Sequence, residues 1–492
     1  MDAEVIVVGA GPTGLTLAAE LGLAGVRTLV LDAATEHSRQ SRAGSIQPRT
    51  AEVLAARGLL DPMLGGRPPR GTIGGHFAGL PVPLPADGWR TRYPHPVTIP
   101  QYDLEMFLEG HLTRFAGVTV RKGHGLVALA QDDDGVTGTL DDGSTVRGRW
   151  LVGCDGGHST VRRLTGVGFP GRSGQYGMVA SDVTLTGPGV AELPTSLRHF
   201  SQAVRANGDT QALLSPLGDG VFRFMFGGPG QLGVGRDEPV TTDEVSRALR
   251  AACGDDLTLG EVRYASRFSD ASRQADAYRV GRVLLAGDAA HIHLPAGGQG
   301  INLGVQDATN LGWKLAGRVR GRTDLLDTYH AERHPVAARV LANTRAQGVL
   351  MNPGDPDVGT LRDLLADLLR LPEARHAMAG MISGLDVTYE LAGKPHPLLG
   401  ARMPDLDLTT ADGPVRLSTV QHDGRGVLLD LTGGRSAAAS AWSDRVRYVA
   451  ATVDDPEADA VLVRPDGHVC WVASADDDLA DALTYWFGAA EG

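Results

Sequence analysis

The stretch that most constrains how this chain folds is residues 4–32, EVIVVGAGPTGLTLAAELGLAGVRTLVLD. Val5–Val8 is a continuous β-branched run, which is typical of a parallel strand covered on both faces. Residues 9–14, GAGPTG, match the pattern G-x-G-x-x-G and open a helical stripe of leucine and alanine. A second strand is expected at 26–31, directly before Asp32. Strand, glycine turn, helix and strand in this order predict a dinucleotide-binding βαβ unit.

The residues of this motif differ in their expected roles. Gly9 permits the tight turn, Gly11 lets a pyrophosphate approach the backbone, and Gly14 lets the helix pack closely on the strand. Thr13 lies between them and is expected at the cofactor as well. Asp32 would accept hydrogen bonds from a ribose 2′-hydroxyl, and its charge disfavours a 2′-phosphate there. The motif does not distinguish FAD from NAD.

A second glycine-rich stretch, 286–304, reads AGDAAHIHLPAGGQGINLG and follows a strand-like apolar run. Asp288 ends that strand, and ligands of open α/β sheets bind at the carboxyl ends of the strands. The glycines of 297–300 open a helix near Ile301, whose N-terminal N–H groups favour negative charge. Because a reduced flavin carries negative charge at one edge of its ring, this stretch favours FAD.

The same stretch contains three residue types that ligate metals: Asp288, His291 and His293. No further cluster of ligands in the sequence supports a metal site, so we expect none. We interpret both histidines as hydrogen-bonded loop residues near the cofactor.

A third stretch of this kind, 145–163, contains another strand and turn. Because the three stretches share one pattern but lie far apart, we expect one nucleotide-binding domain assembled from separate segments. Strand-like runs within 171–265 predict a sheet domain inserted between them. Within that insert, 221–226 is either core or the wall of an apolar pocket, and core is the better interpretation for any single residue. Residues 324–390 have a mainly helical pattern.

The composition excludes several function classes. The net charge of −12 argues against nucleic-acid binding, which favours a basic face. No apolar run approaches the roughly 18 residues that a membrane span requires, and no basic secretory leader is recognisable. Cys154, Cys253 and Cys470 are odd in number and far apart, so no disulfide framework is expected. We expect a soluble cytoplasmic protein without membrane or nucleic-acid partners.

Three motifs in order resemble those of the group A flavoprotein monooxygenases, the family of para-hydroxybenzoate hydroxylase. They are GAGPTG, the pair Asp155 and Gly156 in LVGCDGGHSTVR, and the pair Gly287 and Asp288. The likeness covers essentially the whole chain and is closest to the aromatic polyketide hydroxylases of angucycline and tetracycline pathways, with rifampicin monooxygenases nearby. It implies an α/β fold with a Rossmann-like FAD-binding domain, an inserted β-sheet substrate domain and a C-terminal thioredoxin-like domain.

This resemblance and the pattern along the chain together define the expected domains. They are a discontinuous FAD-binding domain at 1–66, 100–170 and 266–345, a substrate-binding sheet domain at 67–99 and 171–265, a helical connection at 346–392, and a thioredoxin-like domain at 393–492. The last domain contains no CxxC pair. Redox work by that domain is therefore not expected, and Cys470 is interpreted as a packed thiol.

The resemblance also implies which residues hold FAD. Asp288 would bind the ribityl chain, Arg42 would contact the flavin, and Asp155 would serve both FAD and the reductant. Gln101 would lie near the ribityl and phosphate groups, and Leu126 at the adenine end. The groups expected against the isoalloxazine ring are Pro295 and the backbone of Gly298–Asn302, which includes Gly298, Gly300, Ile301 and Asn302.

The activity that the resemblance implies is hydroxylation of a polycyclic aromatic substrate of polyketide type in antibiotic biosynthesis. NADPH (or NADH) would act as a transient reductant of FAD, and oxygen from O₂ would be delivered by a flavin C4a-hydroperoxide. No catalytic side chain is expected, because the cofactor carries the chemistry, while Pro295 and Gly298 position the ring. Three alternatives stay open: Baeyer–Villiger-type oxygenation, oxidative inactivation of an antibiotic, and a non-catalytic protein of the same fold. Both a monomer and a homodimer agree with the sequence.

Overall fold

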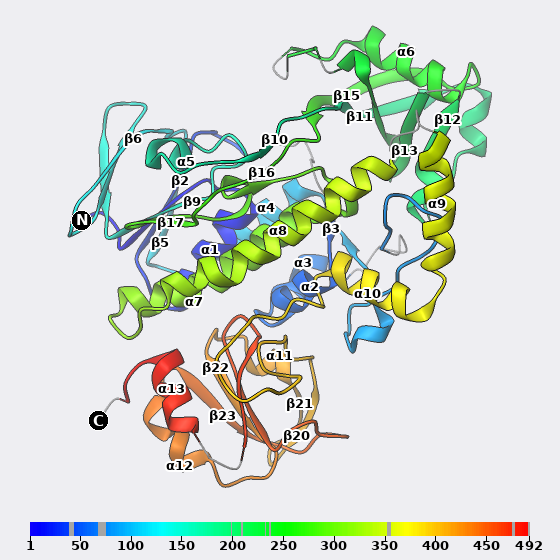
Figure 1. Cartoon of the computed structure of the whole chain (residues 1–492). Helices are drawn as coiled ribbons and strands as arrows, with labels where there is room; N and C mark the ends of the chain where they lie inside the picture. Colours follow the sequence, from blue (N-terminus) through cyan, green and yellow to red (C-terminus); the bar gives the residue numbers. More distant parts are fainter. Residues whose placement is uncertain are drawn as a thin grey trace.

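The structure of the protein is a computed structural model, and it describes residues 1–38, 44–66, 75–197, 199–207, 210–231, 233–235, 238–351, 356–474 and 478–490. Figure 1 shows the C-terminal part, in orange and red, below the rest of the chain. Among the described residues, no helix is both long and apolar enough to cross a membrane.

A six-stranded sheet forms the centre of the N-terminal part, in the order β17-β18-β9-β1-β2-β5. Its strands are β1 (Val5–Val8), β2 (Thr28–Asp32), β5 (Val118–Lys122), β9 (Trp150–Gly153), β17 (Arg279–Val280) and β18 (Val283–Leu285). All are parallel to their neighbours except the edge strand β17. β1 and β9 are buried along their whole length, as a sheet covered on both faces requires. The three stretches that share one sequence pattern therefore meet in one sheet.

Helices α1 (Pro12–Leu23) and α7 (Gly300–Val319) pack against each other and share the core of this sheet. The strand expected to begin at residue 26 begins at Thr28 instead. The reason is that the amide of Val26 donates to the carbonyl of Leu21 (2.9 Å) and still closes the end of α1. Shorter helices on this part are α2 (Pro48–Ala55), α3 (Leu60–Leu64), α4 (Gln101–Leu112) and α5 (Thr160–Thr165).

A five-stranded antiparallel sheet follows in the order β12-β13-β14-β11-β15. Its strands are β11 (Gly177–Thr186), β12 (Val204–Asn207), β13 (Thr210–Gly218), β14 (Val221–Gly228) and β15 (Thr258–Ser269). Helix α6 (Thr242–Cys253) shares a core with one face, which receives Phe222, Phe224 and Phe226. The core interpretation of 221–226 is confirmed for these three phenylalanines. Met225 is half-buried on the opposite face.

Three long helices, α8 (Leu326–Leu350), α9 (Pro356–Leu368) and α10 (Pro372–Ser383), form the helical region. In Figure 1, α8 crosses the molecule towards the five-stranded sheet. The boundary expected at residue 345 therefore falls inside a continuous helix. The described part of 67–99, which was expected in the sheet domain, packs largely elsewhere. Phe77 and Val82 share a core with Leu350 of α8 and with residues of α9 and α10.

Small sheets connect these parts. Their strands are β3 (Ser45–Ile46) with β4 (Val97–Thr98), β6 (Leu126–Gln131) with β7 (Val136–Leu140) and β8 (Thr145–Gly148), and β10 (Gly171–Arg172) with β16 (Ser272–Gln274) and β19 (His291–Ile292). In the last of these sheets, β19 of the glycine-rich stretch pairs with β16, and β16 pairs with β10, at the two ends of the inserted segment.

The C-terminal part contains a four-stranded mixed sheet in the order β23-β22-β24-β25. Its elements are β20 (Asp407–Thr410), β21 (Gly413–Arg416), α11 (Leu417–Val420), β22 (Gly426–Asp430), α12 (Ser436–Ala439), β23 (Val446–Ala450), β24 (Ala460–Val463), β25 (Val469–Val472) and α13 (Leu479–Phe487). β22 is parallel to β23 and antiparallel to β24, which is antiparallel to β25. This is the thioredoxin arrangement that was expected. Cys470 is buried, and burial raises the pKa of its thiol, as fits a packed residue.

Buried charges join the C-terminal part to the rest of the chain. Arg464, at the end of β24, donates to both carboxylate oxygens of Glu332 in α8, at 2.8 and 2.7 Å. The Lys314 ammonium group of α7 donates to the same carboxylate (2.8 Å). None of the three residues is more than 7% exposed, so solvent screens the network little.

Candidate functional site

The glycines of the first motif have different surroundings. A Cβ on Gly9 would lie 2.3 Å from the carbonyl oxygen of Cys154, and one on Gly14 would lie 2.0 Å from that of Gly9. A Cβ on Gly11 would meet no atom within 4 Å. Gly11 is also the N-cap of α1, and among the residues that the structure describes no side chain caps that helix end. Gly9 and Gly14 therefore serve packing, whereas the space at Gly11 and the helix N-terminus suits a pyrophosphate.

Asp32, the predicted ribose ligand, is half-buried at the end of β2. One carboxylate oxygen accepts from the Ala10 amide (2.6 Å) and the other from the Ala34 amide (2.8 Å). The side chain thus braces the glycine turn. Because a carboxylate offers about four acceptor directions, it retains capacity for ribose hydroxyls.

The structure gives less support to three other predicted contacts. Gln101 begins α4 and donates from its side-chain amide to Glu105 (2.7 Å). Leu126 is buried in the core at the start of β6. Arg42 lies outside the described residues. The roles of these residues at the cofactor stay predictions.

Asp155 acts as a local cap. Its carboxylate accepts from the Ser159 hydroxyl (2.5 Å) and from the amides of Thr160 (2.7 Å) and Val161 (3.0 Å) at the start of α5. The same helix carries Arg162, whose guanidinium donates to the carbonyl of Ala289 (2.8 Å). Asp155 is therefore connected through α5 to the turn that carries Asp288, and this indirect route was not foreseen.

Asp288 is exposed, although its neighbours Gly287 and Ala289 are buried in the same short 3-10 turn. Gly287 has a φ of +62°, and a Cβ there would lie 2.6 Å from the hydroxyl of Thr13. The first and last motifs are thus packed together. The carboxylate of Asp288 faces solvent at the carboxyl end of β18, where a ligand of an open sheet is expected.

The two histidines of this stretch are hydrogen-bonded, as predicted. His291 Nε2 lies 2.7 Å from a carboxylate oxygen of Asp307, and His293 Nδ1 lies 2.7 Å from the Leu294 carbonyl. Burial lowers the pKa of His293 and favours its neutral form. Among the described residues, the side chains that gather as a potential metal-binding group are elsewhere, at His124, Asp141 and Asp142. Asp288, His291 and His293 do not form such a group.

The loop before α7 presents one accessible side and one buried side. Pro295 is exposed, and Gly298, Gly300 and Ile301 are half-buried. Gly297 and Gly298 have φ values of +73° and +62°, which other residues adopt only with strain. The side chain of the N-cap residue Gln299 does not bond to the N-terminus of α7, so within the described part of the chain the first amides of this helix are available to a ligand.

Buried amides hold this loop from behind. Asn302 donates to the carbonyls of Gly298 (2.7 Å) and Ser45 (2.9 Å), and its side-chain oxygen accepts from the Gln47 amide (2.7 Å). Gln47 donates in turn to the carbonyl of Gly297 (2.8 Å). Asn302 therefore supports the loop rather than facing outward. Gln47 was not predicted, because nothing in its local sequence marks it.

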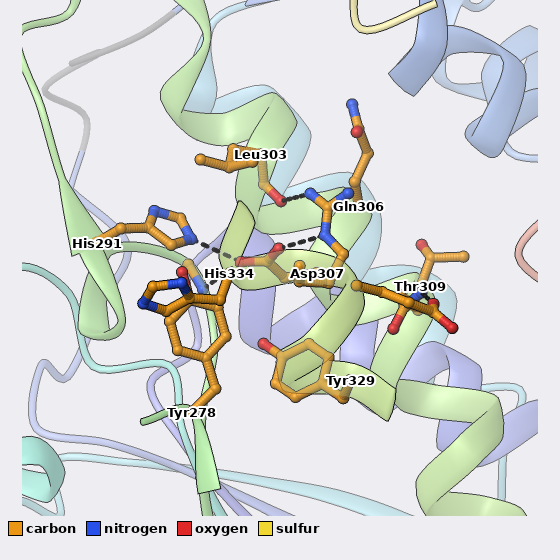
Figure 2. A network of polar contacts seen from close by, with 12 residues as sticks. Tyr278, His291, Leu303, Gln306, Asp307, Thr309, Tyr329 and His334 are labelled. Carbon is orange, nitrogen blue, oxygen red and sulfur yellow. Dashed lines mark hydrogen bonds and ion pairs between the residues drawn. The ribbon is translucent and has the colours of Figure 1, made fainter. Parts of the chain in front are cut away.

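Two further charged residues lie under the site and were also missed. Asp307 in α7, which Figure 2 labels, and Arg333 in α8 are buried and paired, with 2.7 Å between carboxylate and guanidinium. Burial alone would raise the pKa of Asp307, but Arg333 and His291 hold it below its usual value. Asp307 is therefore an anion that can accept hydrogen bonds from the surrounding turn. The only signal in the sequence was an acid within a helical apolar pattern.

Together these contacts fit FAD. Space at Gly11, an exposed carboxylate at Asp288 and the uncapped N-terminus of α7 lie on motifs that are joined by packing and hydrogen bonds. Of the accessible predicted residues, Asp288 suits the hydroxyls of the ribityl chain, and the start of α7 suits the electron-rich edge of the flavin.

Known proteins resemble this chain along its whole length. Family profiles match at residues 2–344 (FAD binding domain) and 396–490 (aromatic-ring hydroxylase, C-terminal). A 12-dehydrotetracycline 5-monooxygenase/anhydrotetracycline 6-monooxygenase of Streptomyces rimosus is 46% identical, with 99% of each chain covered. A rifampicin monooxygenase of Streptomyces venezuelae is also 46% identical, again over 99% of both chains. The solved structure of an aromatic hydroxylase from angucycline biosynthesis superposes with a TM-score of 0.90, at 42% identity and 100% coverage of both chains.

Proposed function

The chain belongs to the family of FAD-dependent aromatic-ring monooxygenases, and we propose that it hydroxylates a polycyclic aromatic polyketide with NADPH and O₂. The observation that carries this proposal is that one glycine-rich stretch presents both an exposed Asp288 and the N-terminus of α7, where the N-cap residue makes no side-chain cap. When bound, FAD supplies the redox chemistry and the activation of oxygen.

The protein's own residues bind and orient the cofactor. Asp288 accepts hydrogen bonds from ribityl hydroxyls, and the first amides of α7 stabilise negative charge on the flavin ring. Pro295 and Gly298 would contact the ring and help to orient it. Gln47 and Asn302 fix the loop from the buried side, so that it does not rearrange when charge develops.

The substrate is proposed to lie over the half-buried face of the five-stranded sheet, away from α6. Leu213, Met225 and Ala180 lie side by side across three strands on that face. At one end, Arg223 and Asp182 form a two-bond ion pair (2.8 and 2.9 Å). An apolar surface with a polar end suits a fused-ring polyketide with hydroxyl groups. It would also help to exclude water from the reaction.

A second candidate function is oxidative inactivation of a rifampicin-type antibiotic. The sequence identity favours this alternative, because the rifampicin monooxygenase and the tetracycline enzyme are both 46% identical to this chain. In both cases the reductant is an intracellular metabolite, and we propose that the reaction takes place in the cytoplasm.

Turnover assays with the purified holoprotein test the proposal. NADPH and NADH oxidation would be followed with anhydrotetracycline, an angucycline intermediate and rifampicin, and products would be analysed by mass spectrometry and NMR. We expect NADPH oxidation that one aromatic polyketide stimulates, with one oxygen atom added as a hydroxyl group. A protein that carries no flavin, or whose NADPH oxidation no aromatic compound stimulates, would contradict the proposal. NMR would reveal ring expansion if the outcome were a Baeyer–Villiger oxygenation.

A further inference from the structure

The carboxylate of Asp307 holds both ends of the turn that presents Asp288. One of its oxygens accepts from the Gly287 amide (3.1 Å), before Asp288, and from His291 (2.7 Å), after it. Figure 2 shows His291 directed at this carboxylate from the side opposite Tyr329. A single side chain on α7 therefore clamps a turn that begins 20 residues earlier in the chain.

The clamp is fully shielded from solvent and its charge is balanced. Asp307 and Arg333 are 0% exposed, and His291 is 1% exposed. Arg333 occupies the other carboxylate oxygen through its Nε (2.7 Å) and also reaches the carbonyl of Leu303 (3.3 Å) and the hydroxyl of Tyr389 (3.2 Å). Because Arg333 stabilises the ionised form of the buried Asp307, the oxygen that faces the turn is available as an acceptor.

Asp288 is exposed and rests on this support. The turn is also held by Arg162 at the Ala289 carbonyl (2.8 Å) and by the Ala290 amide, which donates to the Gly287 carbonyl (2.8 Å). Gly287 itself has a left-handed φ of +62° and no side chain that could add a further contact. The Gly287 amide and the His291 ring are both buried, so losing their acceptor would leave two unsatisfied groups inside the protein. The turn would then relax, and Asp288 would move with it.

We infer that Asp307 is a positioning residue for FAD, which it never touches, and that it acts by holding the turn of Asp288 in the shape that receives the ribityl chain. This inference rests on the cofactor placement proposed above. Loss of hydrogen bonds to a buried charged group predicts about a 10- to 100-fold weaker FAD affinity.

Titration of apoprotein with FAD, followed by flavin fluorescence, tests the inference in Asp307→Asn. The matched control is Asp430→Asn, since Asp430 is also 0% exposed and accepts from backbone amides (Gly433 and Arg435, both 3.0 Å), but lies in the C-terminal domain. We expect the dissociation constant to rise only in Asp307→Asn, while the melting temperature of the apoprotein falls in both. Unchanged affinity in Asp307→Asn, or an equal loss in Asp430→Asn, would overturn the inference.

A double-mutant cycle separates positioning from general damage. If Asp307 acts through Asp288, the double variant Asp288→Asn/Asp307→Asn should bind FAD no more weakly than the weaker single variant. Fully additive losses would refute this route. If Asp307→Asn does not fold, His291→Phe removes one end of the clamp while the pair of Asp307 and Arg333 stays intact, and a several-fold weaker affinity is expected; wild-type affinity would refute the clamp. Absence of FAD binding by the wild type would instead refute the proposed function.

Discussion

The guanidinium of Arg162 donates a hydrogen bond to the carbonyl of Ala289 (2.8 Å), which joins the helix capped by Asp155 to the turn that carries Asp288. The same guanidinium donates to the carbonyl of Gly157 (2.9 Å) and lies 3.7 Å above the ring of Phe169. A direct contact therefore joins two parts of the site that are far apart in sequence.

Arg162→Met should separate these parts while it keeps the packing on Phe169. The buried Ala289 carbonyl and the half-buried Gly157 carbonyl would lose their donor, so we expect a loss of about 1–3 kcal/mol in unfolding free energy and weaker FAD binding. Urea unfolding and FAD titration measure both effects. Arg163→Met is the control, because Arg163 is exposed and pairs with the Thr160 hydroxyl at the surface. Equal effects of the two substitutions would contradict the link.

Alanine at Gly11 and at Gly14 should have opposite consequences. Gly14→Ala brings a Cβ to 2.0 Å from the Gly9 carbonyl, and should destabilise the apoprotein by at least about 2 kcal/mol. Gly11→Ala meets open space at a φ of −77°, so apoprotein stability should change by less than about 1 kcal/mol. Its FAD affinity should nevertheless fall at least tenfold, because the methyl group occupies the pyrophosphate's approach. Thermal melts with and without FAD distinguish the two cases, and normal FAD binding by Gly11→Ala would refute the assigned role.

Glu332 should make the protein sensitive to acid. Burial alone would raise the pKa of Glu332, but Arg464 and Lys314 hold it down to about 2, from the usual 4.5. Between these two pH values the unfolded chain binds more protons than the folded one, so stability is present above pH 4.5 and is lost as the pH falls towards 2. Melting temperatures across this range should therefore fall more steeply in the wild type than in Glu332→Gln.

At neutral pH, Glu332→Gln removes the carboxylate partner of the buried Lys314 and leaves Arg464 with Asp466 alone, and it should cost about 3–5 kcal/mol. Asp444→Asn is the matched control, because its pair with Arg322 (2.8 Å) is substantially exposed and contributes at most about 1 kcal/mol. Urea unfolding would show the difference. Similar small losses in both variants would mean that the network contributes little to joining the C-terminal part.

Cys470 should behave as a packing residue. Its thiol is buried, its pKa is raised by that burial, and its sulfur lies 3.4 Å from the Leu462 carbonyl. Alkylation of the native protein, followed by peptide mass spectrometry, should leave Cys470 unmodified until the chain unfolds. Cys470→Ala should retain substrate-stimulated NADPH oxidation. Loss of turnover in this variant would indicate a redox role that the sequence does not predict.

Local signals explain what the sequence could predict of this protein. The glycine motif and the strand before it were found because the residues that form them are neighbours in the chain. Asp307 was missed because its partners Gly287 and Arg333 lie 20 and 26 residues away, and nothing near Asp307 points to them. The resemblance assigns Asp155 to the cofactor, and that role stays a prediction. Its capping of α5 was not predicted, because it depends on the turn between Asp155 and the helix.

Domain boundaries were harder to predict for the same reason. Leu350 shares a core with Phe77 and Val82, and this contact between distant segments draws the described part of 67–99 to the helices. The sequence contains no helix-ending signal at residue 345, and α8 continues to Leu350. Tertiary packing decided both outcomes.

A crystal structure of the protein with FAD tests the central claim most directly. We predict the isoalloxazine ring against Pro295 and Gly298, with its electron-rich edge at the first amides of α7 and the ribityl hydroxyls on the carboxylate of Asp288. An isoalloxazine bound elsewhere, or a pocket at the start of α7 that side chains or a metal ion fill, would contradict this account.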